Sequence, residues 1–223
     1  MTRRGAAVEI GLIETIRARD GRVPWLGWHL ERLQGAIRSL GLSEPADDLT
    51  DLVRSAAGSG DRAVRLELHG GHAEISTRDV IPARSVGICV STEVHQPYPH
   101  KTTRREQFGR AIAEARRRGF DDALLLTAEG YVAEGTAWNV FWWENGALCT
   151  PSEELGVLPG VGRRRVFELV PVRQERKPFG ALAGESLFLV NAVRGIVEIR
   201  AIDGLAVPAD PRTAELARAF WPD

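Results

Sequence analysis

Residues 95–101 interrupt the regular pattern of the chain and constrain its fold more than any other feature. This segment contains Pro97 and Pro99. Proline fixes the backbone and removes a hydrogen-bond donor, so the segment is typical of a connecting loop. Strand-like alternation and helical spacing of apolar residues occur on both sides of it. We therefore expect a mixed α+β chain with a smaller lobe at 1–94, a loop at 95–101 and a larger lobe at 102–223.

The smaller lobe is predicted to contain strands and one helix. Alternating apolar residues begin a strand at Val8, and the spacing over residues 28–40 predicts a helix that ends at Gly41. A polar loop is expected next. The alternation around Gly70-Gly71 then predicts a hairpin.

The larger lobe is predicted to begin with a helix over residues 108–119. One strand is expected over 131–143, and a glycine-bearing turn at 160–162 precedes a helix at 163–169. Ligand sites favour the space between two lobes, so we expect the functional site there.

The composition favours a cytoplasmic enzyme that acts on small molecules. The net charge of −1 gives no indication of binding to nucleic acid or to an anionic membrane. Cys89 and Cys149 lie in apolar runs without partners at metal-ligand spacing, so we expect free thiols and no metal. There is no run of about 18 apolar residues and no signal-peptide pattern.

Lysine is scarce in this chain, because Lys101 and Lys177 are the only lysines among 29 basic residues. Arginine stays protonated, whereas a lysine amine can lose its proton and attack a carbonyl. Lys101 follows the proline-bearing loop and is a candidate for such chemistry. The alternative is a surface cation, and Lys177 is interpreted as solvated charge.

Three further features could bind an anionic ligand or carry a proton. Arg32 is expected on the side of its helix away from Leu33, where it could clamp a phosphate or simply be solvated. Glu134 stands in an apolar strand, where a buried carboxylate needs a partner, unless it faces outward from an edge. The glycines at 160 and 162 leave amide groups at a helix start accessible to an anion.

An imine-forming lysine, a carboxylate and two phosphate-binding elements are together the set that pyridoxal 5′-phosphate requires. With these residues the chain resembles the fold-type IV, or class IV aminotransferase-like, pyridoxal-phosphate enzymes. The resemblance runs from about Val8 to Asp203. It rests on the segments His29–Leu33, Val132–Phe141, Thr150-Pro151 and Leu158–Arg163 and on the residues around Lys101.

The resemblance implies a two-lobed fold with the cofactor between the lobes and a role for each matching residue. Lys101 would form the Schiff base, Arg32 would bind the phosphate, and Glu134 would pair with the pyridine nitrogen. The other residues implied to bind the cofactor are Asn139, Val161, Gly162, Asn191 and Ala192. Thr15 and Arg104 are the residues implied to contact substrate.

Within this family the chain is most similar to 4-amino-4-deoxychorismate lyases. The similarity lies in residues 10–17, 100–105 and 189–195. It implies conversion of aminodeoxychorismate to 4-aminobenzoate and pyruvate by a homodimer, with aminodeoxychorismate synthase as a functional partner. A class IV transaminase and a non-catalytic relative are the alternatives.

The chain departs from the family at two positions. Gly162 and Ala192 stand where relatives commonly have threonine or serine, whose hydroxyls would contact phosphate. We therefore expect weakened cofactor binding, which threonine at either position should strengthen.

Overall fold

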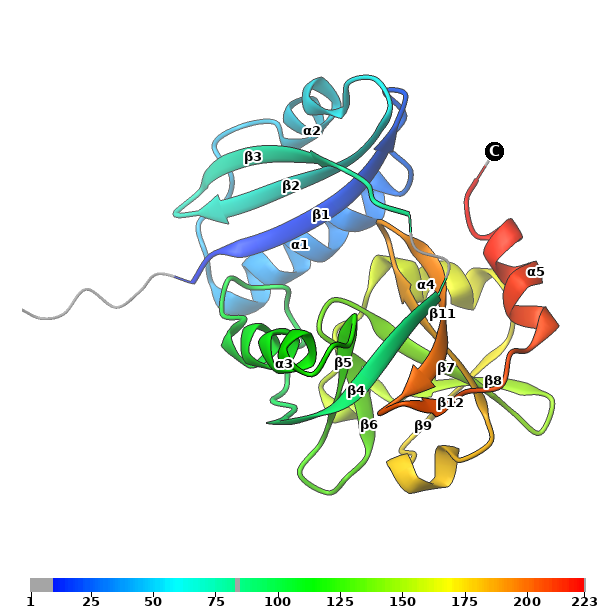
Figure 1. Ribbon diagram of the computed structural model, residues 1–223. Coiled ribbons are helices and arrows are strands. Elements are labelled where there is room, and N and C mark those ends of the chain that lie inside the picture. Colours follow the sequence, from blue (N-terminus) through cyan, green and yellow to red (C-terminus); the bar gives the residue numbers. More distant parts are fainter. Residues whose placement is uncertain (1–9, 83–84, 223) are drawn as a thin grey trace, which may run out of the picture. The chain divides into compact units, whose positions relative to one another are not determined.

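The computed structural model describes residues 10–82 and 85–222, so the strand start predicted at Val8 lies outside the described residues. The chain combines helices with two sheets, as expected for a mixed α+β fold (Figure 1). It divides into two compact units. Unit 1 contains the described residues up to Arg78 together with Lys101–Arg104, and unit 2 contains Asp79–His100 and the residues from Arg105 onward.

Unit 1 is an antiparallel sheet packed against two helices. Its strands are β1 (Leu12–Arg19), β2 (Asp61–His69) and β3 (His72–Asp79), in that order across the sheet. The hairpin predicted around Gly70-Gly71 is formed by β2 and β3. Helix α1 (Leu26–Leu40) ends at Gly41 in the left-handed conformation, as predicted.

The second helix of unit 1, α2 (Leu49–Ala57), occupies part of the segment predicted as a polar loop, so that prediction was wrong. Asp48 caps it by accepting hydrogen bonds from the backbone N–H groups of Thr50 and Asp51. Val53 and Ala57 are fully buried against the sheet core. The apolar stripe is too short to stand out among the surrounding polar residues.

Unit 2 is built on a sheet of nine described strands, shown from green to orange in Figure 1. Strand β10 pairs with both β11 and β7, so the strands β10-β11-β4-β5-β6-β7 close into a ring whose interior is apolar. The strands are β4 (Ser85–Val94), β5 (Asp122–Leu126), β6 (Val132–Gly135), β7 (Asn139–Glu144), β8 (Ala147–Pro151), β9 (Val172–Glu175), β10 (Ser186–Asn191), β11 (Gly195–Ile202) and β12 (Leu205–Ala206). The helices are α3 (Glu106–Arg117), α4 (Val161–Leu169) and α5 (Pro211–Ala219), with single 3₁₀ turns at Glu153–Leu155 and Phe179–Leu182.

The strand predicted over residues 131–143 is two strands, because a turn separates β6 from β7. Asp122 holds this turn from the start of β5. Its Oδ1 accepts hydrogen bonds from the Thr136 backbone (3.0 Å) and hydroxyl (2.8 Å), and its Oδ2 accepts one from the Trp138 indole (2.9 Å). Burial raises the pKa of Asp122, and these hydrogen bonds counteract that shift.

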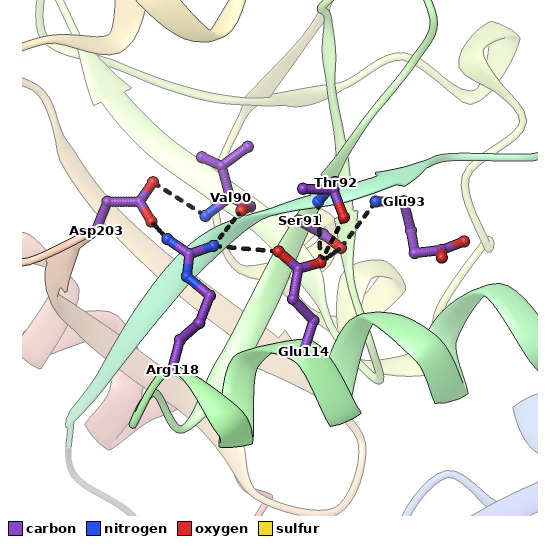
Figure 2. A network of polar contacts seen from close by, with 7 residues as sticks. All are labelled: Val90, Ser91, Thr92, Glu93, Glu114, Arg118 and Asp203. Carbon is purple, nitrogen blue, oxygen red and sulfur yellow. Dashed lines mark hydrogen bonds and ion pairs between the residues drawn. The ribbon is translucent and has the colours of Figure 1, made fainter.

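A polar network fixes helix α3 against β4 and the turn between β11 and β12 (Figure 2). Oε2 of Glu114 accepts hydrogen bonds from the Ser91 hydroxyl (2.8 Å) and the Thr92 backbone (3.0 Å). Arg118 forms ion pairs with Glu114 and Asp203.

Among the described residues, no helix is both long enough and apolar enough to cross a membrane.

Candidate active site

Lys101 lies beside β1 within unit 1. The Ile13 N–H donates to the Lys101 carbonyl (2.8 Å), and the Thr103 N–H donates to the Gly11 carbonyl (2.9 Å). Leu12 and Thr102 form an antiparallel bridge, so the segment extends the sheet on the side of β1 away from β2. These hydrogen bonds hold the Lys101 backbone beside β1, and its side chain is partly buried.

Glu14 is the buried acid of this unit. Leu12, Glu14 and Ile16 alternate along β1 and face helix α1, where Glu14 is 1% exposed. Arg32 donates two hydrogen bonds to it, from Nε to Oε1 (2.8 Å) and from Nη2 to Oε2 (2.6 Å). His29 Nδ1 lies 2.7 Å from Oε2. One carboxylate therefore binds two side chains of α1.

The charges in this cluster are well defined. Burial alone would raise the pKa of Glu14, but Arg32 and His29 outweigh it and lower the pKa to about 2. Burial lowers the pKa of His29, and the positive charges of Arg32 and Lys101 lower it further, against the effect of Glu14. The cluster thus contains a carboxylate, a guanidinium and a neutral histidine that donates from Nδ1.

The predicted orientation of Arg32 was wrong. The sequence placed Arg32 away from the buried side of its helix, yet its guanidinium faces β1 and its side chain is 14% exposed. Arg32 follows His29 by three positions, so both lie on neighbouring turns of one face. Glu14 compensates the buried charge, which a hydrophobic periodicity does not reveal.

Lys177 is not solvated charge, which corrects the second lysine prediction. Its side chain is 17% exposed, and its ammonium group forms an ion pair with Glu144. The hydrogen bond to Glu144 raises the pKa of Lys177 and so stabilises the protonated form. A lysine held protonated is unsuited to act as a base or nucleophile.

Glu134 lies on β6 in unit 2, where it is 3% exposed. It pairs across the strands with Asn139 on β7. Both side chains contact the same residue: the Leu158 N–H donates to Oε2 of Glu134 (3.3 Å), and Asn139 Nδ2 donates to the Leu158 carbonyl (2.8 Å). His95 Nε2 lies 2.8 Å from Oε1 of Glu134. The carboxylate is buried and supported on both oxygens.

The segment after Leu158 leads into α4, which begins at Val161. Gly160 occupies the N-cap position and has no side chain to accept from the first N–H groups of the helix. A Cβ atom at Gly160 would lie 2.0 Å from Oδ1 of Asn139. A Cβ atom at Gly162 would lie 2.7 Å from the carbonyl carbon of Asn191. A side chain at Gly162 would therefore clash with backbone, and one at Gly160 would displace the Asn139 amide that binds Leu158.

The Asn191-Ala192 turn completes this part of unit 2. Oδ1 of Asn191 accepts hydrogen bonds from the N–H groups of Val193 (3.0 Å) and Arg194 (2.7 Å). Nδ2 of Asn191 donates to the Ala137 carbonyl (3.3 Å). The structure thus brings together all the predicted residues of unit 2: Glu134, Asn139, Val161, Gly162, Asn191 and Ala192.

The packing overturns the expectation that threonine at Gly162 would strengthen binding. The atoms within 3.0 Å of a Cβ atom there are backbone atoms of Asn191 and Ala192, which cannot rotate away as a side chain can. The glycine is required by close backbone approach. Ala192 remains a position where a hydroxyl could be added.

The two residues predicted to contact substrate, Thr15 and Arg104, both lie in unit 1. Thr15 lies on β1, on the face opposite Glu14 by strand alternation, and pairs with Arg65 of β2. Arg104 is exposed at the end of the Lys101 segment. Neither position tests a role with substrate.

Sequence reasoning gave no role to three buried residues of these sites, Glu14, His29 and His95. Glu14 could have been recognised, because it occupies an apolar face of β1 and is followed by a histidine and an arginine at helical spacing. His95 carries no such signal, since its partner Glu134 is distant in the sequence.

Comparison with known proteins agrees with this arrangement. The family model for class IV aminotransferases matches residues 11–202. An aminodeoxychorismate lyase of Bacillus subtilis (strain 168) is 28% identical over 71% of this chain and 64% of its own length. The branched-chain-amino-acid aminotransferase of Escherichia coli (strain K12) is 31% identical over 49% of this chain and 38% of its own length. The chain thus spans less than two thirds of either relative.

A solved structure shows the same fold over nearly the whole chain. The branched-chain aminotransferase of Thermoproteus uzoniensis superimposes with a TM-score of 0.84 and 26% identity, covering 95% of this chain and 84% of its own. The family match extends from β1 to the end of β11 and so includes both buried glutamates and Lys101. The chain belongs to the class IV aminotransferases, the pyridoxal-phosphate enzymes of fold type IV.

Proposed function

We propose that this chain is a pyridoxal-phosphate-dependent lyase that converts 4-amino-4-deoxychorismate to 4-aminobenzoate and pyruvate. The cofactor part of the proposal is supported by the arrangement in unit 2 of a buried carboxylate close to a helix start without a capping side chain. A ligand with a basic ring nitrogen and a phosphate fits these two features. No side chain caps the first N–H groups of α4, so these groups could donate to an anion. The lyase part is supported by the similarity to an aminodeoxychorismate lyase.

In unit 2, Glu134 would pair with the pyridine nitrogen of the cofactor, and Val161 and Gly162 would offer backbone N–H groups to its phosphate. Asn139 holds the Leu158 peptide beside Glu134, and the turn at Asn191 and Ala192 lies against Gly162. Hydrogen bonds from backbone amides to a charged phosphate are stronger than those between neutral groups.

In unit 1, Lys101 would supply the amine that bonds to the cofactor, and Arg32 would be a second phosphate ligand. Arg32 is held in place by Glu14, which fixes the direction of its guanidinium. Pyridoxal phosphate, when bound, supplies a ring that withdraws electrons from the substrate.

Lys101 would carry the protons of the reaction. Its Nζ would remove the proton at C4 of the substrate, the bond between C3 and the enolpyruvyl oxygen would break, and Nζ would return a proton to the departing group. The products are 4-aminobenzoate and pyruvate, and formation of the aromatic ring favours the forward direction. An amine can act in this way only when it has lost its own proton.

The second candidate is a transaminase, favoured by the similarity to branched-chain aminotransferases. In that reaction an amino group passes to a 2-oxo acid, which the lyase does not need. The two activities share the residues that bind the cofactor and differ in substrate contacts. The third candidate, a relative that no longer binds cofactor, conflicts with the retention of Lys101, Arg32 and Glu134.

One incubation separates these candidates. The purified protein with pyridoxal phosphate is given aminodeoxychorismate and no 2-oxo acid, and pyruvate is measured. A lyase releases pyruvate with 4-aminobenzoate, whereas a transaminase needs an acceptor. Pyruvate that forms only after a 2-oxo acid is added would contradict the lyase proposal.

The role of Lys101 has its own test. Borohydride reduction followed by peptide mapping should place the pyridoxyl label on Lys101. Lys101→Ala should abolish both label and turnover. Lys177→Ala is the control and should change neither, since Lys177 is paired with Glu144. A label on Lys177 would contradict the mechanism.

The proposal includes a homodimer in the cytoplasm, with aminodeoxychorismate synthase supplying the substrate. Light scattering after size exclusion tests the dimer. Co-purification with the synthase tests the partner.

A further inference from the structure

His95 is a buried histidine for which neither the sequence motifs nor the proposed mechanism has a use. It follows the last residue of β4, and its backbone N–H donates to the Leu126 carbonyl at the end of β5 (2.8 Å). Its side chain is 1% exposed. A polar ring buried to this extent requires an explanation in terms of its hydrogen bonds.

The backbone next to His95 is held from two directions. Gln107 of α3 accepts from the Gln96 N–H (2.7 Å) and donates to the Gln96 carbonyl (2.9 Å), so one side chain satisfies both groups. The Tyr98 N–H donates to the Gly156 carbonyl (2.7 Å), and the Tyr98 ring packs edge-on against Phe108. Helix α3 is itself fixed by the network of Glu114 and Arg118 (Figure 2). The position of His95 is therefore determined by its surroundings.

The imidazole contacts Glu134 through one nitrogen only. His95 Nε2 lies 2.8 Å from Oε1 of Glu134, whose side chain is 4% exposed. Nδ1 of His95 is buried and has no hydrogen-bond partner within residues 10–82 and 85–222. A protonated ring would place an N–H at Nδ1 without an acceptor, which is costly in a buried site. The geometry therefore favours a neutral ring that donates from Nε2 to the carboxylate.

The contribution of this hydrogen bond follows from what else Glu134 contacts. In the part of the chain that the structure describes, its other hydrogen bond comes from the Leu158 N–H at 3.3 Å, which is long for an N–H donor. Without the His95 donor, the carboxylate would keep only this long hydrogen bond, and no side-chain donor among the described residues would fix the direction of Oε1.

We propose that His95 is a positioning residue that holds the carboxylate of Glu134 oriented toward the pyridine nitrogen of the cofactor. This inference rests on the role of Glu134 in the proposed function. His95 acts through Glu134 and does not itself contact the cofactor. The connecting loop at residues 95–101 would then both position Glu134 and lead to Lys101.

Four single variants test this, with pyridoxal phosphate titrated into the apo-protein and binding followed by absorbance. His95→Leu removes the donor and keeps apolar volume. His95→Gln keeps an N–H at about the reach of Nε2, whereas His95→Asn has a similar amide that is too short. His72→Leu is the matched control, because His72 is exposed on β3. Thermal unfolding of each apo-protein shows that the variants compared are folded.

We expect His95→Leu and His95→Asn to weaken cofactor binding by about tenfold or more, as for loss of one hydrogen bond to a charged group. His95→Gln should stay within about threefold of the parent, and His72→Leu should match the parent. Binding by His95→Leu or His95→Asn at the strength of the parent would overturn the proposal. So would equal losses in His95→Gln and His95→Asn.

His95→Leu in a Glu134→Gln background distinguishes a positioning role of His95 from a packing role. If His95 acts through Glu134, His95→Leu should change binding by less than about twofold once the carboxylate is gone. An equal loss in both backgrounds would show a packing role and overturn the proposal. The measurement uses no substrate, so its outcome does not depend on whether the chain is a lyase or a transaminase.

Discussion

The two units each bury a glutamate that contacts a histidine, and the two pairs are almost identical in distance. His29 Nδ1 lies 2.7 Å from Glu14, and His95 Nε2 lies 2.8 Å from Glu134. In each ring the other nitrogen is buried without a hydrogen-bond partner among the described residues. The difference is Arg32, which donates two hydrogen bonds to Glu14, whereas Glu134 has one backbone donor.

This difference indicates two uses for a buried carboxylate. Glu14 is balanced by a guanidinium, and its pKa of about 2 keeps it ionised at every ordinary pH. Its negative charge is already compensated within unit 1. Glu134 has no guanidinium or ammonium partner among the described residues, so its charge remains available to a cationic ligand. We therefore expect Glu14 to contribute mainly to stability and Glu134 mainly to chemistry.

The largest effect is expected from Glu134→Gln, which keeps shape and removes charge. We predict a fall in kcat of about a thousandfold or more, equivalent to about 4 kcal/mol of barrier. The free energy of unfolding of the apo-protein should change by less than about 1 kcal/mol, because no cation is left without its partner. Steady-state kinetics measure kcat, and urea unfolding measures the free energy of unfolding. Turnover close to that of the parent would refute the assigned role.

Glu14→Gln, in contrast, should lower the stability of the apo-protein. It leaves the guanidinium of Arg32 largely buried without its carboxylate, which typically costs about 3 kcal/mol or more. Urea unfolding of the apo-protein measures this loss, with Glu67→Gln as a control for a carboxylate in a more exposed ion pair. If Glu14→Gln and Glu67→Gln lower the free energy of unfolding equally, the Glu14 cluster stabilises the protein no more than the Arg65–Glu67 pair does.

The contrast between the two units also shows what sequence can predict. Local signals identified α1 with its end at Gly41, the β2–β3 hairpin and the residues gathered around α4. They failed where a distant partner decides the outcome. Asp122 splits the strand over 131–143 through its hydrogen bonds to Thr136 and Trp138, and Glu14 turns Arg32 toward the sheet. Hydrophobic periodicity predicts which face of an element is apolar, but it does not predict which charged side chains will form ion pairs.

Threonine at Gly162 tests the packing of α4 in unit 2. The added Cβ would lie 2.7 Å from the carbonyl carbon of Asn191, so we predict a loss of about 2 kcal/mol in the free energy of unfolding. Gly109→Thr is a helical control, since a Cβ there meets nothing within 4 Å. A Gly162→Thr variant as stable as the parent, with tighter cofactor binding, would restore the expectation from the sequence.

The pH dependence of stability sharpens the assignment of Glu14. Its folded pKa of about 2 lies below the ordinary value of 4.5, so the unfolded chain takes up the proton first as pH falls. The contribution of ionised Glu14 to the free energy of unfolding is therefore complete above pH 4.5, and it is lost as pH falls toward 2. The stability gap between the parent and Glu14→Gln should therefore narrow by about 2 kcal/mol between pH 5 and pH 3. A constant gap over this range would contradict a lowered pKa.

The smallest effect is expected at Ala192, which has no hydroxyl and lies against the start of α4 in unit 2. Ala192 is 8% exposed, and its backbone nitrogen lies near the start of α4, 3.0 Å from where a Cβ at Gly162 would be. Ala192→Thr adds a hydroxyl there, and Ala192→Val adds the same volume without it. We predict that threonine binds pyridoxal phosphate about three- to tenfold more tightly than valine, as for one additional hydrogen bond. Titration of the two apo-proteins measures the ratio. Equal affinities would mean that the phosphate does not reach this turn, and that Arg32 and the α4 amides bind it without help from residue 192.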